Sequence, residues 1–500
     1  MASKTRRVAV IGAGPSGAIT TDTLVKEQAF DNIRVFDRRA GVGGTWQVPL
    51  GTIKQHFNAH DLTQALHTTS TDRLSITPRS SRRQSGRAYT DTDPASICDT
   101  SHQHRFSDTA IHENLHSNIT PEIMSFSQHP FPDKLSERSI AEYGNTNVPF
   151  RHHTTITEWI ESIFAPHQKL LELETTVERA EKLRGEWFLT LRKELAGRNY
   201  WWQETFDAVI VASGHYNVPW CPNIPGLLEF DKNYPGKIVH SKHFRNPAKY
   251  AGKKIIVVGV SVSSHEIIHE VLEVAQHPVY AAIRGDPIAA FGWERFDHPL
   301  IKFTKQIRQV EPETGRIVFD DGSFLDDVDH VFFGTCYTFS VPFIPAVQER
   351  IKKAYRRLPG VYQHTWNIED PSLAFIGQLG GGFTFRVYEW PAVAVARRLA
   401  GRGKALATVV EQLEWERRRV VEKKGGKDNY SIAPDYAEFF EFLRGIAGEP
   451  AAGTIGRSLP KFDPEWLKVW SDMVATKIGG WQRKRKRVEE AEAGIVKAKL

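Results

Sequence analysis

Residues 12–17, GAGPSG, constrain the fold of this chain more than any other stretch. Gly12, Gly14 and Gly17 follow the short apolar run RRVAVI and precede AITTDTLVKE, which can form a helix. In a strand–turn–helix unit of this kind the first glycine permits a tight turn, the second lets the backbone approach a pyrophosphate, and the third allows close helix–strand packing. The stretch therefore predicts a parallel βαβ unit that binds a dinucleotide at the start of its helix.

An acidic residue supports this interpretation. Asp37 lies 20 positions after Gly17, near the end of the second predicted strand, NIRVFDRR. There its carboxylate can accept hydrogen bonds from the ribose hydroxyls of a bound dinucleotide. The residues of this unit that are expected to contact the cofactor are Gly12, Gly14, Pro15, Ser16, Gly17, Asp37 and Arg38.

A second turn of the same kind follows the apolar run KKIIVV. Gly259, Ser261 and Ser264 occupy its three glycine places, with Ser263 beside them. Serine is small enough for such a turn, and its hydroxyl can donate to a phosphate. Arg284 stands 20 positions after Ser264, where the first unit has an acid. Because an acid suits a free 2′-hydroxyl and an arginine suits a 2′-phosphate, we expect FAD at the first unit and NADPH at the second. The alternative for Arg284 is a plain surface charge.

The order of the elements indicates an α/β protein with two Rossmann-like dinucleotide-binding domains, the NADPH domain inserted into the FAD domain. A chain of 500 residues is too long for one simple core. We expect the first part of the FAD domain at 1–218, the NADPH domain at 219–340, and the second part of the FAD domain with a C-terminal helical tail at 341–500. Residues 63–111, rich in Ser, Thr, Arg and Asp, are expected to form a flexible surface insertion.

Composition excludes several classes of protein. The net charge of +6 is too small for this length to indicate a nucleic-acid partner. Cys98, Cys221 and Cys336 lie far apart without a C-x-x-C pair, which favours a reducing compartment and excludes a disulfide reductase. The apolar runs are too short to span a bilayer, and the N-terminus leads directly into a strand. We expect a soluble, cytoplasmic protein, with a homodimer as one option for its oligomeric state, which no motif decides.

The stretch YPGKIVHSKHFR, residues 234–245, carries the most specific motif. Tyr234, Gly236, His240 and Phe244 match the pattern F-x-G-x-x-x-H-x-x-x-F/Y, with Tyr in place of the first Phe. The further matching segments are GGTW at 43–46, NLHSN at 114–118, FSQHPFP at 126–132, ASGHYNVPWCPNIPG at 212–226 and, more loosely, FGTCY at 333–337. In this ordered set the chain resembles the flavin-containing monooxygenases. It looks like a soluble, fungal-like member, since the tail lacks the apolar anchor of the membrane-bound animal members.

The resemblance implies an enzyme of the N,N-dimethylaniline monooxygenase type that uses FAD and NADPH. In such enzymes NADPH reduces FAD, O₂ adds at flavin C4a, and the hydroperoxide transfers one oxygen to a nucleophilic N or S of a small molecule. By this resemblance Asn118 is the catalytic residue, which hydrogen-bonds the flavin or NADP⁺, while Ser117 and the loop Gly44, Thr45 and Trp46 contact the flavin. A helix cap in SNITPE is the alternative for Asn118.

Two charged clusters have alternative interpretations. His240 and His243 stand three apart but lack a third ligand at suitable spacing, so no metal site is expected. We expect His240 to support the linker between the domains and, with Ser241, to lie in the NADPH-contacting stretch. Lys242 either reaches a phosphate or faces solvent. The cluster RKRKR at 483–487 is followed by VEEAEAG, which favours a solvated helix with compensating acids over a localisation signal.

Two other functions fit the same cofactors. The fingerprint of Baeyer–Villiger monooxygenases ends in Trp followed by Pro or Asp, whereas this chain has Phe244 and Arg245, so ketone oxidation ranks second. An NADPH oxidase that releases H₂O₂, or a non-catalytic dinucleotide-binding protein, is the third hypothesis, since the second turn is degenerate. No motif identifies the substrate.

Overall fold

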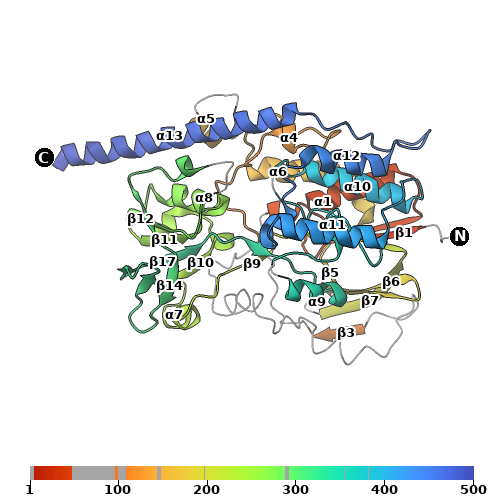
Figure 1. Ribbon diagram of the computed structural model, residues 1–500, viewed down its shortest axis with the longest axis horizontal. Helices are drawn as coiled ribbons and strands as arrows, with labels where there is room; N and C mark the ends of the chain where they lie inside the picture. The colour runs from red at the N-terminus through yellow and green to blue at the C-terminus, as the bar shows by residue number, and fades with distance from the viewer. Residues whose placement is uncertain are drawn as a thin grey trace.

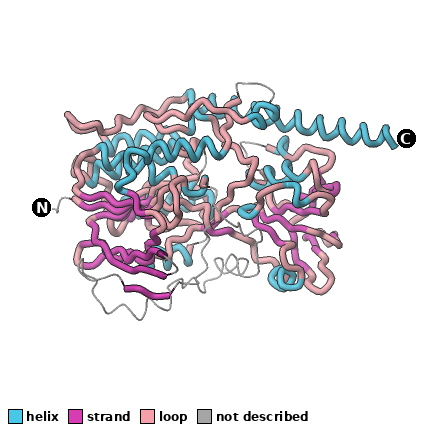
Figure 2. The backbone as a smooth tube through the Cα atoms, turned by 180° about the vertical axis from the view of Figure 1, so that it is seen from behind, coloured by secondary structure: helices cyan, strands magenta, loops and turns pink. Residues whose placement is uncertain are grey.

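Two bodies, each built on a sheet that begins at one of the glycine turns, organise the chain. The computed structural model describes residues 5–47, 96–99, 108–143, 148–195, 198–287, 292–354, 356–380 and 382–499. A long C-terminal helix runs across both bodies in Figure 1, and Figure 2 shows their strands in two separate groups. Among the helices of the described residues, none combines the length and the apolar character needed to cross a bilayer.

The first sheet has seven strands in the order β19-β20-β21-β8-β1-β2-β4. Its strands are β1 Arg7–Ile11, β2 Asn32–Phe36, β4 Leu171–Glu172, β8 Ala208–Val211, β19 Val361–Tyr362, β20 Trp366–Asn367 and β21 Leu373–Phe375. Helix α1, Pro15–Lys26, joins β1 to β2, which pair in parallel with Val8 opposite Ile33. Both predicted strands and their connecting helix are confirmed. The short apolar runs fit strands that are covered on both faces.

The second body is inserted between two neighbouring strands of this sheet. Strands β8 and β21 pair in parallel with Val209 opposite Leu373, although the chain leaves at one and returns at the other. Its own parallel sheet has the order β10-β17-β11-β12-β13. These strands are β10 Ile238–His240, β11 Lys254–Val258, β12 Gln276–Ala282, β13 Ile301–Thr304 and β17 His330–Phe333, and helix α8, Val262–Val271, follows β11. The predicted fold class is therefore confirmed.

A short antiparallel ribbon connects the two bodies. Strand β9, Val218–Pro219, leads into the inserted body and pairs with β18, Tyr337–Thr338, which leads out of it. The Trp220 backbone N–H donates to the Cys336 carbonyl over 3.0 Å. This ribbon, called the hinge below, therefore ties the outgoing connection to the returning one.

A strand lies inside the predicted surface insertion. Strand β3, Ser96–Asp99, pairs with β7, Arg198–Phe206, at the edge of an antiparallel sheet. That sheet continues through β6, Glu186–Leu195, and β5, Thr175–Leu183. The expectation of a flexible insertion over 63–111 is wrong at β3, because backbone pairing does not need an apolar pattern, and most of the remaining segment lies outside the described residues. A smaller sheet contains β14 Ile307–Val310, β15 Ile317–Phe319 and β16 Phe324–Leu325.

Helices α1, α6, α10 and α12 pack together above the first sheet (Figure 1). The remaining helices are α4 Pro121–Met124, α5 Glu137–Tyr143, α6 His153–Phe164, α7 Leu227–Asn233, α9 Pro345–Lys353, α10 Arg386–Leu399, α11 Val409–Glu422, α12 Tyr436–Ala447 and α13 Glu465–Lys499. The 3₁₀ turns are η1 Gly44–Trp46, η2 Ala165–Leu170, η3 Ser241–His243, η4 Pro247–Tyr250, η5 Trp293–Arg295 and η6 Gly426–Tyr430.

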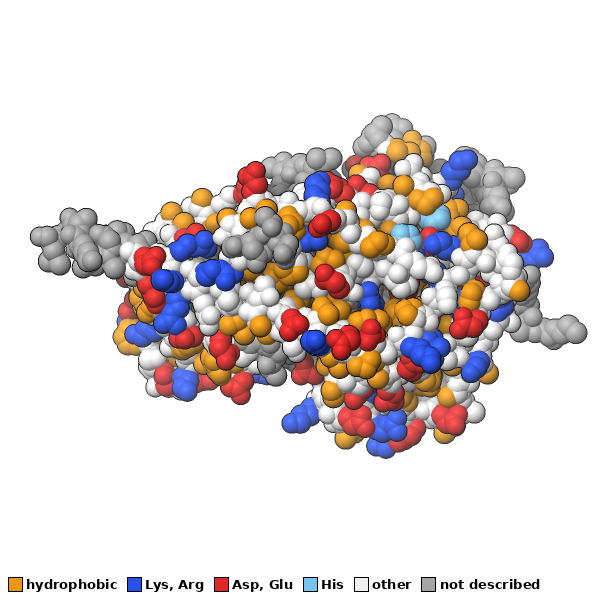
Figure 3. Space-filling view, turned by 90° about the horizontal axis from the view of Figure 1, so that it is seen from above, with side chains coloured by type: hydrophobic (Ala, Val, Ile, Leu, Met, Phe, Trp, Pro, Cys, Tyr) orange, Lys and Arg blue, Asp and Glu red, His pale blue; other side chains and the backbone are white. Residues whose placement is uncertain are grey.

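The basic cluster at 483–487 lies on α13. Arg485 pairs with Glu489 one turn along the helix at 2.9 Å and with Asp297 at 2.7 Å. From above, acidic and basic side chains are interspersed on the surface of the molecule (Figure 3). The interpretation as a solvated helix with compensating acids is confirmed at Arg485.

A buried ionic network joins the C-terminal segment to the first helix. The Arg457 guanidinium donates to Asp22 on α1 over 2.8 Å and to Glu389 on α10 over 2.6 Å. All three side chains are buried. Burial alone would raise the pKa of Asp22, but His167, Arg457 and Lys26 together hold it well below its ordinary value. The network therefore keeps its charges paired inside the core.

Replacing Arg457 by Ala should lower the free energy of unfolding by about 3–5 kcal/mol, because two buried carboxylates lose their common cation. Urea denaturation of the wild type and the variant measures the difference. Arg417→Ala is the matched control, since Arg417 is exposed and pairs only with Glu414 on its own helix among the contacts of the described residues. A loss as small as that of the control would contradict this account.

Candidate functional site

A large cavity opens where strands β1, β2 and β8 end. It encloses about 1650 Å³, including the part that is open to solvent. Its walls include Ile11 and Phe36, the last residues of β1 and β2, and Ala212, which follows β8. The predicted residues that line it are Gly12, Gly14, Pro15, Ser16, Asp37, Arg38, Gly44, Thr45 and Trp46. In an open parallel sheet this edge is the expected place for a ligand.

The glycines leave room that a side chain would fill. A Cβ on Gly12 would lie 2.5 Å from the Ala212 carbonyl oxygen, and a Cβ on Gly17 would collide with the Gly12 carbonyl oxygen. Gly44 approaches the turn almost as closely, since a Cβ added to Gly44 would lie 2.8 Å from Gly14 Cα. The wall of the cavity at this point is therefore bare backbone, and the N-terminus of α1 begins there. Such a cradle fits the pyrophosphate of FAD.

Asp37, the residue after β2, stabilises the first glycine turn by hydrogen bonds. Its Oδ2 accepts the Ala13 backbone N–H over 2.7 Å, and its Oδ1 accepts the Arg39 N–H over 2.8 Å. Each carboxylate oxygen can accept a further hydrogen bond. The residue is buried at the rim of the cavity, where those remaining lone pairs fit ribose hydroxyls.

The opposite wall contains residues that were not predicted as site residues. His215, Tyr216 and Asn217 follow β8, and Phe385 and Tyr388 stand at the start of α10. His215 Nδ1–H donates to the Gly377 carbonyl over 3.2 Å, and burial lowers the pKa of His215 to about 4. His215 is therefore neutral near pH 7. Polar residues directly after the apolar strand FDAVIVASG were the available signal.

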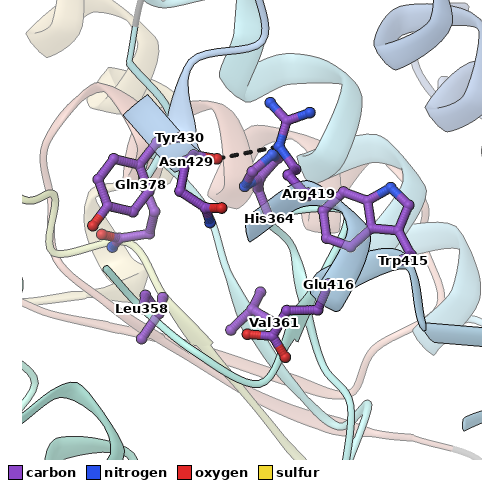
Figure 4. A pocket seen from close by; sticks show the side chains of 9 residues that line it. All are labelled: Leu358, Val361, His364, Gln378, Trp415, Glu416, Arg419, Asn429 and Tyr430. Carbon is purple, nitrogen blue, oxygen red and sulfur yellow. Dashed lines mark hydrogen bonds between the residues drawn. The ribbon is translucent and has the colours of Figure 1, made fainter. Parts of the chain in front are cut away.

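A small pocket lies behind this wall, between α11 and the β19–β20 hairpin (Figure 4). Its residues are Leu358, Val361, His364, Gln378, Trp415, Glu416, Arg419, Asn429 and Tyr430. Arg419 Nε–H donates to the Asn429 backbone carbonyl over 3.2 Å. The Tyr430 ring packs on Phe339 at 4.2 Å between ring centres and faces His215 at 6.2 Å. The pocket thus backs the cavity and contains no predicted site residue.

The second glycine turn has the same shape with different contacts. Gly259 has φ +108°, and Ser261 precedes the first residue of α8. Ser264 is buried, and its hydroxyl donates to the Gly334 carbonyl over 3.2 Å. A Cβ on Gly334 would collide with that hydroxyl. The expectation that Ser264 donates to a phosphate is therefore wrong, because its hydroxyl donates to Gly334, the residue after β17.

Other residues of this unit have the exposure that a phosphate site needs. Ser261 and Ser263 are partly exposed at the N-terminus of α8, and Arg284 is exposed two residues after β12. They lie at the carboxyl edge of the second parallel sheet, the position that the cavity occupies on the first. Their roles toward NADPH stay predictions.

The motif at 234–245 lies at the hinge. His240 Nε2–H donates to the Cys336 carbonyl over 3.0 Å, and its Nδ1 accepts the Lys242 N–H over 3.1 Å. Ser241 is buried beside Tyr337. Phe244 is a core residue that stacks on the Tyr250 ring at 5.8 Å. The structure therefore places His240 against the connection that returns to the first body, as expected for a linker support.

Lys242 is buried rather than exposed. Its Nζ lies 3.1 Å from Asp108 Oδ1 and donates to the Asn217 carbonyl over 2.8 Å. Burial lowers the pKa of Lys242 to about 8, although Asp108 acts in the opposite direction. His243 Nδ1 lies 2.9 Å from the second oxygen of Asp108. The solvent-facing alternative for Lys242 is wrong, because an acid from the predicted insertion pairs with it.

Ser117 and Asn118 lie apart from the cavity wall. Within the described part of the chain, neither is among the residues that line it. The Ser117 hydroxyl donates to the Ile119 carbonyl over 2.9 Å and accepts the Arg151 N–H over 3.0 Å. Asn118 Oδ1 accepts a hydrogen bond from Lys477 on α13. The helix-cap alternative for Asn118 is wrong, since α4 begins after Thr120.

The chain is similar to known flavoproteins over most of its length. The family model described as flavin-binding monooxygenase-like matches residues 99–295 and 298–450. Flavin-containing monooxygenase iboF of Amanita muscaria is 27% identical over 89% of this chain and 86% of its own. The thiol-specific monooxygenase of Saccharomyces cerevisiae is 25% identical over 74% and 72%.

Solved structures share the fold. S-allyl-L-cysteine S-oxygenase from Allium sativum superposes with a TM-score of 0.69 at 20% identity and covers 99% of both chains. Cyclohexanone monooxygenase superposes with a TM-score of 0.52 at 12% identity over 89% of this chain and 98% of its own. At these identities the likeness shows the fold alone.

Replacing Asp37 by Ala should weaken FAD binding by about 10–100-fold, because charge-assisted hydrogen bonds contribute about 1.5–3 kcal/mol each. Flavin content after purification and the FAD dissociation constant of the stripped protein measure the effect. Asp31→Ala is the control, since Asp31 is exposed directly before β2 and pairs with Arg6. Unchanged flavin affinity in the Asp37 variant would rule out its ribose contact.

Proposed function

The chain belongs to the flavin-binding monooxygenase-like family, and on this premise we propose that it transfers one oxygen atom from O₂ to a nucleophilic nitrogen or sulfur of a small molecule. As a member it is a flavin-dependent monooxygenase with FAD and NADPH as cofactors. The proposal rests on the combination of two dinucleotide-binding turns in one chain. The turn of the first body is followed by Asp37, and the turn of the body inserted into it is followed by Arg284.

The protein residues of the first body bind and orient the flavin. Bound FAD would supply the electron and oxygen transfer, which side chains cannot perform. The backbone of residues 12–17 would hold its pyrophosphate and Asp37 its ribose. Trp46, Phe385 and Tyr388 give the cavity an apolar wall, and the Trp46 and Phe385 rings meet edge to face at 5.9 Å. That wall would exclude water from the reacting centre.

The inserted body would bind NADPH at the second turn. Ser261 and Ser263 would contact its phosphates at the N-terminus of α8, and Arg284 its 2′-phosphate. The β9–β18 ribbon supports domain boundaries near 218 and 340. For His240 and Ser241 we propose a hinge role in place of a direct cofactor contact, because His240 uses both ring nitrogens within the protein.

Asn118 is the proposed catalytic contact to the flavin or to bound NADP⁺. Its support is its place beside Glu266 on α8, the helix that follows the second turn: burial raises the pKa of the Glu266 carboxyl, and the Asn118 side chain lowers it.

Oxygenation of a heteroatom is favoured over ketone oxidation. The fingerprint ends in Phe244 and Arg245, and Phe244 packs in an aromatic core with Tyr250 and Phe332. Two of the similar proteins carry names that state action on sulfur, one on thiols and one on S-allyl-L-cysteine. Sulfur is therefore the first substrate class to test, with amines beside it.

The test is turnover of the flavin-loaded enzyme with NADPH and O₂ on a thiol, a thioether, a tertiary amine and a cyclic ketone. We expect oxygenated product from a sulfur or nitrogen compound in amounts that match the NADPH consumed. Faster turnover of the ketone would support the Baeyer–Villiger alternative. NADPH consumption that yields only H₂O₂ would support an oxidase. Failure of NADPH to bleach the flavin would contradict both the monooxygenase and the oxidase hypotheses.

Replacing Arg284 by Ala should raise the KM for NADPH by about 10-fold or more and leave the KM for NADH nearly unchanged. The reason is that only NADPH carries the 2′-phosphate to which the arginine would make a charge-assisted hydrogen bond. Steady-state kinetics with the two coenzymes measure the ratio. Arg308→Ala is the matched control, an exposed arginine of the same body. Equal losses for both coenzymes would show that Arg284 does not read the 2′-phosphate.

A further inference from the structure

The C-terminal helix α13 is more than a solvated tail. It packs against α4 and α5 of the first body and against η5 of the inserted body. Met473, Lys477 and Trp481 are all buried, and they recur every four residues. Residues at this spacing form one stripe along a helix. The helix therefore buries a single face, and that face has a lysine at its centre.

Two neighbouring residues at the C-terminal end of this stripe touch different bodies. Gly480 lets the helix approach α5, because a Cβ there would lie 2.7 Å from the Tyr143 ring. The centre of the Trp481 ring lies 4.4 Å from the guanidinium carbon of Arg295. The same ring packs edge to face on the His265 ring of α8, with 4.2 Å between ring centres. Helix α13 thus bridges the first body and the helix that follows the second glycine turn (Figure 1).

Lys477 occupies the junction between these contacts. Its ammonium donates to Asn118 Oδ1 and lies 4.6 Å from the centre of the Phe150 ring. Burial lowers the pKa of Lys477 to about 8, although Glu266 acts in the opposite direction. A buried ammonium is costly unless it is paired and hydrogen-bonded, so the placement of Lys477 is bound to that of its partners.

The two partners of Asn118 determine the orientation of its amide. The Lys477 ammonium can only donate, so Asn118 Oδ1 must face Lys477 and Nδ2 points away from it. The Asn118 side chain also interacts with the Glu266 carboxyl, whose pKa is raised by burial. Lys477 therefore determines which end of the Asn118 amide is oxygen and which is nitrogen.

We propose that Lys477 and Glu266 are positioning residues that hold the Asn118 amide in its productive orientation when the two bodies and α13 are docked together. The proposal rests on the role given to Asn118 under the proposed function. It goes further in assigning two residues outside the cofactor-binding turns, one of them on the C-terminal helix, to the same reaction.

The test is a double-mutant cycle in the flavin-loaded enzyme with Asn118→Ala, Lys477→Met and their combination. The first measurement is the dissociation constant of NADP⁺ from the flavin difference spectrum, which needs no turnover. The second is the fraction of consumed NADPH that yields product rather than H₂O₂. Lys468→Met is the matched control, since Lys468 is exposed on the same helix.

We expect Lys477→Met to weaken NADP⁺ binding and to lower the product fraction by about as much as Asn118→Ala, each several-fold, with flavin content unchanged. The double variant should lose no more than the larger single loss, because coupled residues are not additive. Lys477→Arg, which keeps a charged donor, should recover part of the loss. Wild-type behaviour of Lys477→Met, or additive losses in the double variant, would overturn the proposal.

Two further outcomes separate this proposal from the proposed function. If the wild type oxygenates no sulfur or nitrogen compound, the proposed function fails while the NADP⁺ cycle still decides the role of Lys477. If Lys477→Met does not fold, Glu266→Gln replaces it in the cycle with Asn118→Ala. Non-additivity there supports the proposal, and additivity overturns it.

Discussion

The close approach of the backbone at the first glycine turn is the constraint on which the first body depends. No side chain fits at Gly17, because it would collide with the Gly12 carbonyl, and none fits at Gly12 against Ala212. This contact sets α1 directly on the end of β1 and directs its N-terminus toward the cavity. Gly44 and Gly377 then close against Gly14 and Ser16, so the cavity is assembled from segments far apart in the chain.

The second turn has a different close contact. Ser264 stands where the first unit has its third glycine, and a Cβ on Gly334 of the neighbouring segment would collide with the Ser264 side chain. The Ser264 hydroxyl donates to the Gly334 carbonyl over 3.2 Å. Gly334 therefore makes room for the serine of the degenerate turn.

Buried charges pair residues that lie far apart in the sequence. Lys242 and His243 pair with Asp108 at the hinge, and Lys477 of α13 donates to Asn118. Displacement of either partner would leave an ion unpaired in a poorly hydrated interior. These electrostatic contacts therefore add to the constraint that the β9–β18 ribbon places on the connection between the bodies.

The sequence by itself determined the two βαβ units, their order, the insertion of one into the other, and the cavity residues from Gly12 to Trp46, because strand, turn and helix signals act over short stretches of backbone. Only the tertiary structure decided the partners of Lys242, Ser264 and Asn118. Asp108 lies in a polar segment without periodicity, and Lys477 lies in a charged tail. Pairings between such distant residues leave no local pattern, since they depend on where the fold brings each side chain.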